Sequence, residues 1–214
     1  MTAPLTIVGR SSSHFTRTVS IFAAELAAPC AFEPVFDIRS REAHVFGENP
    51  MLRVPSLRTP EGTWFGSLNA CRELARRSTS DLPLVWPEDL TQPAGANAQE
   101  IVTDAMSTGV VIVLSRVNGL ADDVPLLDKP FARLAGALAW LEANLDAVLA
   151  PLPERRLSFL EVSAFCLLTH LEFRELGRLD GRPRLQAFCS RFGARPSAQQ
   201  TPYRFDQPPA PLSA

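Results

Sequence analysis

The feature that most constrains the fold is the succession of a short apolar run, a helical pattern and a second strand-like run at the start of the chain. The first run, LTIVG at residues 5–9, has the length and composition of a short buried strand. Apolar side chains then recur at helical spacing between residues 14 and 27, and Pro29 ends that helix. The segment CAFEPVFD, residues 30–37, can form a second strand. This order predicts an α/β sandwich in which the two strands pair in parallel.

A predicted hairpin and a second helix complete this first segment. The sequence TPEG at residues 59–62 has proline second and glycine fourth, which is typical of a type I turn between two strands. The helical segment SLNACRELARR, residues 67–77, follows, and Ser67 is a plausible N-cap for it. The segment therefore has the order βαβ and then ββα, and it ends near Arg77.

The rest of the chain has helical patterns. Residues 78–99 are rich in proline, serine and asparagine, which is typical of a linker. Helices are then predicted at residues 98–117, 131–148, 157–173 and 184–192. The third of these is apolar nearly all round and is therefore expected in the middle of its domain. Ser158 and Glu161 form a predicted capping box at its start.

These patterns predict two domains. We expect an α/β domain at residues 1–78, a linker at 79–98 and an all-helical domain at 99–214. The chain of 214 residues is long enough to bury a full core without disulfides.

The composition is that of a globular protein of the cytoplasm. Of its residues, 46% are hydrophobic and 21% are charged, and the net charge of -2 predicts no nucleic-acid surface. The longest apolar stretch, GVVIVL, is too short to span a bilayer, and the first residues lack a signal-peptide pattern. The four cysteines are far apart, which favours buried free thiols. No spacing typical of metal ligands is present, so no metal site is predicted.

The order of elements and four short motifs together resemble the cytosolic glutathione S-transferase family. The motifs are VPSL at residues 54–57, GSLNACREL at 66–74, SFLE at 158–161 and RPSAQQTPY at 195–203. They occur in the family's order and at its separations over most of the chain. The resemblance implies a thioredoxin-like N-terminal domain of the βαβββα type and an all-helical C-terminal domain.

The resemblance also implies a site for glutathione. The family has a cis-proline after a valine, a pattern that Val54 and Pro55 match, and the backbone of that valine pairs with glutathione like an added strand. Arg53 precedes this pair and is included in the site. In the family, the serine equivalent to Ser67 and the helix N-terminus behind it receive the γ-glutamyl carboxylate.

One position in this site departs from the family. The family usually has Glu or Gln immediately before the serine, whereas this chain has Gly66. The departure removes a contact to the γ-glutamyl group, and Asn69 could partly replace it.

The group that faces the glutathione sulfur is expected at the end of the first strand, in SSSHFTRTV at residues 11–19. Family members use tyrosine, serine or cysteine there. The only tyrosine of this chain is Tyr203, in the tail, and the segment has no cysteine, so a serine is left. The stretch RSSSHF, residues 10–15, resembles the corresponding stretch of the serine-using zeta-like classes.

The choice among the serines depends on how the segment is matched. Counting back from Arg17 selects Ser12, which we favour, and matching the arginine before the serines selects Ser11 as the second choice. Ser13 is expected in the glutathione site and is also the best N-cap. A Ser-His-acid triad with His14 is disfavoured, because adjacent side chains at a helix start do not face each other.

A serine hydroxyl is sufficient to activate the thiol without a general base. Lowering a thiol pKa from ~8.5 by about two units requires roughly 2.7 kcal/mol. A hydrogen bond to an anion supplies ~1.5–3 kcal/mol, and a helix N-terminus adds ~0.3–1 kcal/mol.

The second substrate is expected beside the helix at residues 98–117. Met106 and Val110 are candidates for the pocket, and Arg116 or Arg10 could meet an anionic group. The function implied is a homodimeric detoxification enzyme in which a serine-activated glutathione thiolate attacks an electrophilic small molecule. Two alternatives stay open: a zeta-like glutathione-dependent isomerase, and a catalytically silent binding or scaffold protein, which Gly66 favours.

Overall fold

The computed structural model describes residues 5–154 and 156–208, and the chain divides into two units. Unit 1 extends to Ser80 and resumes at Ser197, whereas unit 2 spans Asp81–Pro196. In this division the segment from Ser197 lies in unit 1, whereas the sequence analysis places it in the all-helical domain at 99–214. Within the described ranges, no helix is long and apolar enough to cross a membrane.

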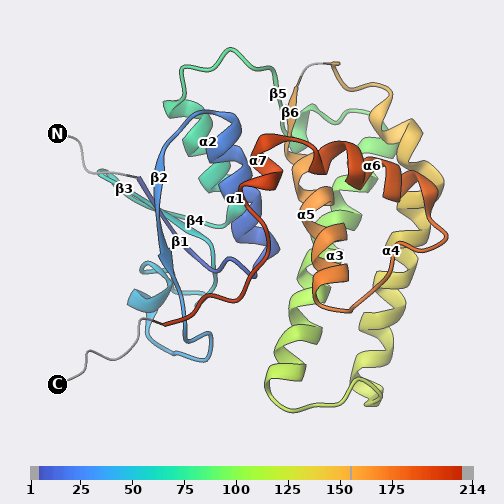
Figure 1. Cartoon of the computed structure of the whole chain (residues 1–214), viewed down its shortest axis with the longest axis horizontal. Coiled ribbons are helices and arrows are strands. Elements are labelled where there is room, and N and C mark those ends of the chain that lie inside the picture. The colour runs from blue at the N-terminus through green and yellow to red at the C-terminus, as the bar shows by residue number, and fades with distance from the viewer. Residues whose placement is uncertain (1–4, 155, 209–214) are drawn as a thin grey trace. The chain divides into compact units, whose positions relative to one another are not determined.

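Unit 1 contains the mixed sheet that the start of the sequence predicts (Figure 1). In spatial order its strands are β2 (Cys30–Pro34), β1 (Leu5–Gly9), β3 (Ser56–Thr59) and β4 (Gly62–Phe65). β1 pairs in parallel with β2 and antiparallel with β3, and β3 pairs antiparallel with β4. The predicted strand–helix–strand unit and the hairpin are both confirmed.

Two helices cover one face of this sheet. α1 (His14–Glu25) and α2 (Ser67–Arg77) pack against each other, α1 against β1 and α2 against β3 and β4. α1 buries most of its apolar stripe, including Val19 and Phe22, as the helical spacing predicts, and Phe15 is half-buried. A short 3-10 helix, η1 (Ala43–Phe46), lies between β2 and β3.

The start of α2 differs from the prediction in one residue. Ser67 is the first helical residue, and Gly66 stands at the N-cap position without a side chain to cap the helix. The reason is local: the Gly66 N–H donates to the Pro55 carbonyl at 3.0 Å, and the chain then turns into the helix with a Gly66 φ of 82°. Glycine adopts this left-handed region readily, whereas an L side chain rarely does.

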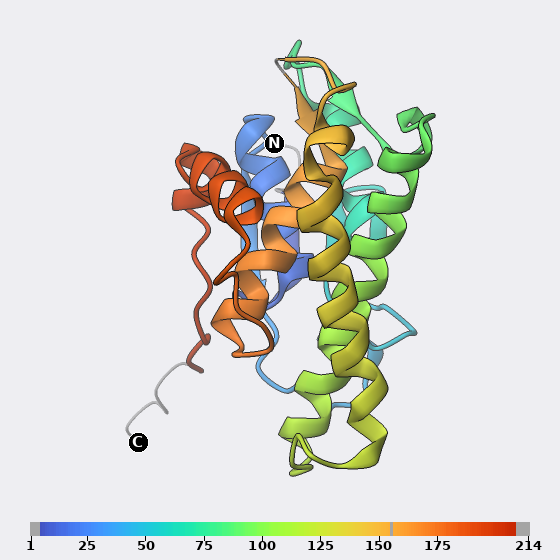
Figure 2. The ribbon, with the colours of Figure 1, turned by 90° about the vertical axis from the view of Figure 1, so that its right-hand side faces the viewer.

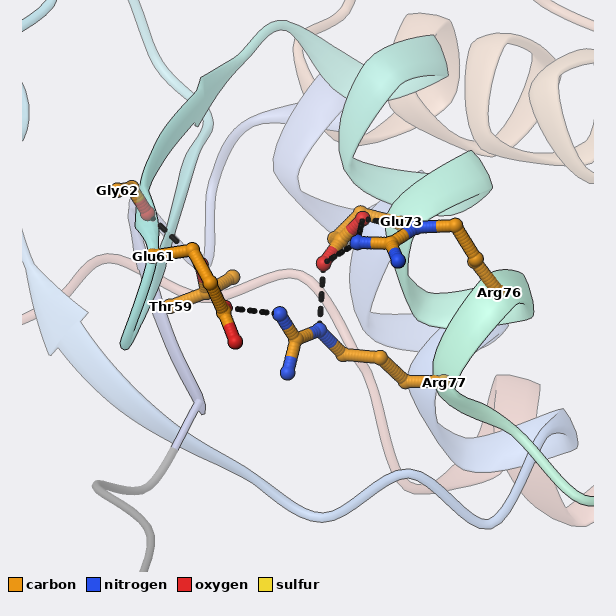
Figure 3. Close-up of polar contacts among 6 residues, drawn as sticks. All are labelled: Thr59, Glu61, Gly62, Glu73, Arg76 and Arg77. Carbon is orange, nitrogen blue, oxygen red and sulfur yellow. Dashed lines mark hydrogen bonds and ion pairs between the residues drawn. The ribbon is translucent and has the colours of Figure 1, made fainter.

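A buried carboxylate joins α2 to the β3–β4 hairpin (Figure 3). Glu73, whose side chain is 1% exposed, accepts hydrogen bonds from the guanidinium groups of Arg76 and Arg77. Arg77 also contacts Glu61 in the turn of the hairpin, where the Thr59 hydroxyl donates to the Gly62 carbonyl at 2.9 Å. The network therefore fixes the helix against the hairpin.

Unit 2 is built from four main helices. Figure 2 shows the two longest, α3 (Pro93–Val117) and α4 (Pro125–Leu149), side by side and running in opposite directions. α5 (Phe159–Phe173) packs against α3 and against α6 (Pro183–Gly193), and nearly all of its side chains are buried. The expectation that this apolar helix lies in the middle of its unit is confirmed.

The segment expected to be a linker contains regular structure. β5 (Leu84–Val85) pairs in parallel with β6 (Leu157–Ser158), and the 3-10 helix η2 (Pro87–Asp89) follows β5. α3 begins at Pro93, five residues before the predicted start at 98. Proline at the first helical position costs no hydrogen bond, so the proline-rich composition was compatible with a helix start.

The predicted capping box of α5 is formed in one direction. The Ser158 hydroxyl accepts the Glu161 N–H at 3.4 Å, so the N-cap is confirmed. The Glu161 carboxylate instead binds the Arg156 guanidinium, at 2.6 Å from Nε and 2.8 Å from Nη2. A nearby charged donor is a stronger partner for a carboxylate than a backbone N–H.

Candidate functional site

The register of the sheet in unit 1 brings three chain segments to one edge. Val8 at the end of β1 lies opposite Ser56 at the start of β3, and Ser56 lies opposite Phe65 at the end of β4. The residues just after β1, just before β3 and just after β4 are therefore neighbours. The bond from the Gly66 N–H to the Pro55 carbonyl, 3.0 Å long, joins the last two segments directly.

The segment before β3 has the backbone that the family resemblance implies. The Val54–Pro55 peptide bond is cis. Val54 is half-buried and packs against the small core of Val8 and its neighbours. Arg53 is exposed, and its carbonyl accepts a hydrogen bond from the Asn49 side chain at 2.9 Å.

The segment after β4 presents the N-terminus of α2. The first N–H bonded inside this helix turn is that of Ala70, which donates to the Gly66 carbonyl at 3.1 Å. The N–H groups of residues 67–69 precede it and are the ones that a helix leaves for an outside acceptor. Asn69 is exposed, and its side chain donates to the Phe65 carbonyl at 3.1 Å, so one of its two amide hydrogens is already engaged.

The structure gives the three serines after β1 different environments. Ser13 is the N-cap of α1, and its hydroxyl accepts the Thr16 N–H at 3.3 Å, which confirms its capping role. Ser11 is half-buried, and its N–H donates to the Asp206 carboxylate at 2.8 Å. Ser12 is 2% exposed, and no hydrogen bond joins its side chain to another residue in the described part of the chain.

The two arginines of this segment are engaged in structural contacts. Arg10 donates from Nη1 to the carbonyls of Val35 and Phe36, at 2.9 Å each, and so binds the end of β1 to the chain after β2. Arg17 is buried, donates to the Ala198 carbonyl at 3.2 Å, and has its guanidinium 4.4 Å from the centre of the Tyr203 ring.

The candidate substrate residues lie on α3 in unit 2. Met106 is buried, and Val110 is half-buried. Arg116 is bonded to the Asp122 carboxylate and donates to the Arg174 carbonyl at 2.7 Å. An anionic substrate at Arg116 would therefore compete with Asp122, and the role of all three in substrate binding stays a prediction.

Sequence reasoning did not indicate that the tail lies beside α1 and the serine segment. The residues from Ser197 to Asp206 contact α1 and the serine segment through hydrogen bonds from side chains. They also help to line a cavity of about 630 Å³ beside α1 and β2, to which Arg10, Arg17 and Arg204 contribute. The tail is proline-rich and has no periodic pattern, so no signal in the sequence indicated where it would lie.

Comparisons by sequence alone identify no relative. No protein-family model matches the chain, and no curated protein matches it.

Comparisons of the fold with solved structures give a clear result: unit 1 and unit 2 together have the fold of glutathione transferases. A glutathione transferase family member from Pseudomonas fluorescens, solved with bound glutathione, has a TM-score of 0.75 and 20% identity, covering 94% of this chain and 99% of that one. A glutathione S-transferase from Methylobacterium radiotolerans, in complex with glutathione sulfonate, has a TM-score of 0.71 and 20% identity, covering 97% and 99%. One from Methylobacillus flagellatus with bound glutathione has a TM-score of 0.72 and 18% identity, covering 92% and 98%.

The fold class predicted from the sequence is thereby confirmed. It is a thioredoxin-like unit with a four-stranded mixed sheet, together with a helical unit.

Proposed function

We propose that this protein is a glutathione transferase that binds glutathione along the sheet edge of unit 1 and activates its thiol with Ser12. The observation that carries the proposal is the convergence of three segments at that edge: the serines after β1, Val54 before β3 and the α2 N-terminus after β4. Glutathione is a peptide with a thiol and two carboxylates. A backbone edge, a hydroxyl and a helix N-terminus are the groups that would bind it.

The peptide backbone of glutathione would lie along Val54, whose segment leads directly into β3. The γ-glutamyl carboxylate would accept hydrogen bonds from the N–H groups at the start of α2 and from the Ser67 hydroxyl. Gly66 adds no side chain to this contact. We therefore expect weaker binding than a Glu or Gln at this position would give, with the backbone N–H groups carrying most of the affinity.

Ser12 is the candidate for thiol activation because it is the buried serine of the segment, and no hydrogen bond joins its hydroxyl to another residue in the described part of the chain. The Ser13 hydroxyl already caps α1, whereas Ser11 is held through its backbone N–H and remains the second candidate. A buried hydroxyl next to a helix N-terminus stabilises a thiolate by donating a hydrogen bond to it. The thiolate then attacks an electrophilic carbon of the second substrate.

The first experiment is a thermal unfolding measurement with and without glutathione. At a concentration one hundred times the Kd, binding adds ~2.7 kcal/mol to the free energy of unfolding, which raises the Tm by roughly 5–10 °C for a chain of this size. A Tm that stays constant up to high millimolar glutathione would contradict the proposal. It would support the alternative of a silent scaffold protein, which Gly66 favours.

The second experiment compares Ser12→Ala with Ser11→Ala. We expect Ser12→Ala to raise the pKa of the bound thiol by one to two units, the loss of about 1.5–3 kcal/mol of thiolate stabilisation. Ser11→Ala should leave it within about half a unit. Ultraviolet absorbance of the thiolate at a series of pH values gives both numbers, and equal pKa values in the two variants would contradict the assignment.

The serine in this position also suits a zeta-like isomerase, in which glutathione is recycled. The two reactions differ in whether glutathione is consumed. We expect it to be consumed in proportion to product when an activated aryl chloride is supplied, because the thiolate displaces chloride. The cytoplasmic location, the homodimer and the detoxification role remain proposals that follow from the family resemblance.

A further inference from the structure

We propose that Asp206, in the C-terminal tail, is a positioning residue that holds the turn presenting Ser12. The inference rests on the proposed function, since it deepens the role of the serine segment. Asp206 is separated from Ser11 by 195 positions, yet its Oδ2 accepts the Ser11 N–H at 2.8 Å. The side chain of Asp206 is 8% exposed.

The turn from Arg10 to Ser13 is held by its backbone N–H groups. The Arg10 N–H donates to the Thr16 hydroxyl at 3.3 Å, and the Ser13 N–H donates to the Arg10 carbonyl at 3.0 Å. The Ser11 N–H donates to Asp206. Ser12 lies between the last two contacts, so its orientation depends on both.

The tail is anchored before it reaches the turn. The Ser197 hydroxyl donates to the Glu25 carboxylate at 2.5 Å, at the end of α1. Arg17, one helical turn into α1, binds the Ala198 carbonyl and has its guanidinium over the Tyr203 ring. Figure 1 shows the chain after α7 (Pro196–Gln199) running beside α1 and past the loop that leads from β1 into it.

These anchors give the only tyrosine of the chain a role. Tyr203 is too far along the chain to be the expected thiol-facing tyrosine of the family, but its contact with Arg17 fixes the tail three residues before Asp206. A tail held at Ser197, Ala198 and Tyr203 delivers the Asp206 carboxylate at little further cost in chain entropy.

The Asp206 contact also engages the backbone N–H of Ser11, which could otherwise donate to a bound ligand. Because the Ser11 N–H is bound by a carboxylate, it is not available to the thiolate. A charged acceptor makes this bond roughly twice as strong as a neutral one. Removing the carboxylate therefore frees the Ser11 N–H and loosens the turn, whereas the contacts of glutathione with Val54 and with α2 are made by other segments.

The test compares Asp206→Ala, Asp206→Asn and, as a matched control in the same tail, the exposed Gln207→Ala. We expect Asp206→Ala to lower kcat about tenfold with an activated aryl chloride, as a rise of one unit in the pKa of the bound thiol would. The KM for glutathione should change less than about twofold. Asp206→Asn keeps an oxygen that accepts the Ser11 N–H and should restore kcat to within about threefold of the original protein, as should Gln207→Ala.

Three results would overturn the inference. They are an unchanged kcat in Asp206→Ala, a loss in Asp206→Asn as large as in Asp206→Ala, and an increase in the KM for glutathione that accounts for the whole effect. The second would show that charge and not hydrogen bonding matters. The third would show that Asp206 acts on glutathione binding.

A readout that needs no activity keeps the inference separate from the proposed function. Hydrogen exchange of the Ser11 amide, followed by NMR, should become at least tenfold faster in Asp206→Ala and stay unchanged in Asp206→Asn and Gln207→Ala. If the original protein binds no glutathione but shows this pattern, the proposed function fails and the positioning of the turn stands. If the Ser11 amide exchanges equally fast in all four proteins, the positioning role is wrong whatever the activity.

Discussion

At the residue scale, the burial of a side chain in unit 1 changes its pKa, as Cys30 shows. Cys30 begins β2 and lines the cavity beside α1, where its thiol donates to the Ala28 carbonyl at 3.4 Å. Burial raises the pKa of the Cys30 thiol to about 11, because the thiolate would lose its hydration. The Cys30 thiol therefore stays neutral near pH 7.

The rate of Cys30 alkylation tests this environment. In a Cys189→Ser variant, with Cys71 and Cys166 buried, we expect the rate of reaction with iodoacetamide to reach half its maximum near a pH of about 11. A midpoint near 9, the ordinary value for the thiol, would show that Cys30 is hydrated. Mass spectrometry of the labelled peptide gives the rate.

The raised pKa of Cys30 also makes the free energy of unfolding depend on pH. The contribution of Cys30 to stability is present below pH 9 and is lost as the pH rises through the pKa of the folded protein, about 11.

Glu73 provides a second test at this scale. Glu73→Gln keeps the shape of the buried side chain. It replaces one of the two carboxylate oxygens, which accept hydrogen bonds from Arg76 and Arg77, with an amide nitrogen that can only donate. We expect the free energy of unfolding in urea to fall by about 1–3 kcal/mol. Glu61→Gln, which changes the exposed end of the same network, is the control and should cost less than about 1 kcal/mol. Equal losses would mean that burial of Glu73 does not matter.

At the scale of the element, residues at the helix ends determine where each helix begins and ends. α3, α4 and α6 each begin with a proline at the first helical position, and α1 and α5 begin behind a serine cap. The C-terminal end of α3 is held by Arg116, which joins Asp122 in the following loop to the chain after α5.

The ion pair at this turn gives a pH prediction. The hydrogen bond from Arg116 lowers the pKa of Asp122 below its ordinary value of 3.8. Its contribution to stability is therefore present above about pH 4 and is lost as the pH falls through the lower folded value. We expect Asp122→Asn to be less stable than the original protein at neutral pH, and the gap in urea midpoint to narrow as the pH is lowered below about 4. A gap independent of pH would show that the pair does not titrate as described.

At the scale of the whole molecule, the chain leaves unit 1 at residue 80 and returns to it at Ser197. The tail then adds contacts to α1 and to the serine segment that unit 1 could not make from its first eighty residues. We expect a chain ending at Gly193 to lose these contacts, so its unit 1 should unfold at a lower temperature than in the full chain.

The oligomeric state belongs to the same scale. We expect a homodimer by sedimentation, as the family resemblance implies. Met51, in the loop before β3, is 66% exposed and is the best apolar candidate in unit 1 for such an interface. Met51→Lys should weaken association at least tenfold, whereas Leu126→Lys, equally exposed on α4, is the control. A monomer in the original protein would remove the dimer from the proposal.

The sequence by itself determined the order of the main helices and strands and the positions of the motifs, but not the short β5–β6 pair. Local signals are sufficient for this: the apolar run of β1, the TPEG turn, the Ser158 cap and the stripe of α4 all depend on neighbours within a few residues. The Val54–Pro55 pattern and the serine cluster could be found in the same way, through a resemblance that short motifs carry. Where local signals misled, as at Pro93 and Ser67, proline and glycine fitted a helix start as well as a loop.

Only the tertiary structure decided the surroundings of the three serines and what holds their turn. The serines are adjacent and chemically identical, so they differ only through burial and the partners brought by folding: Thr16 for the Ser13 hydroxyl, Asp206 for the Ser11 backbone N–H, and burial for Ser12. The Asp206 contact spans nearly the whole chain, and no local preference encodes a contact at that distance. It forms because burial of the tail against α1 offsets the entropy of closing so long a loop.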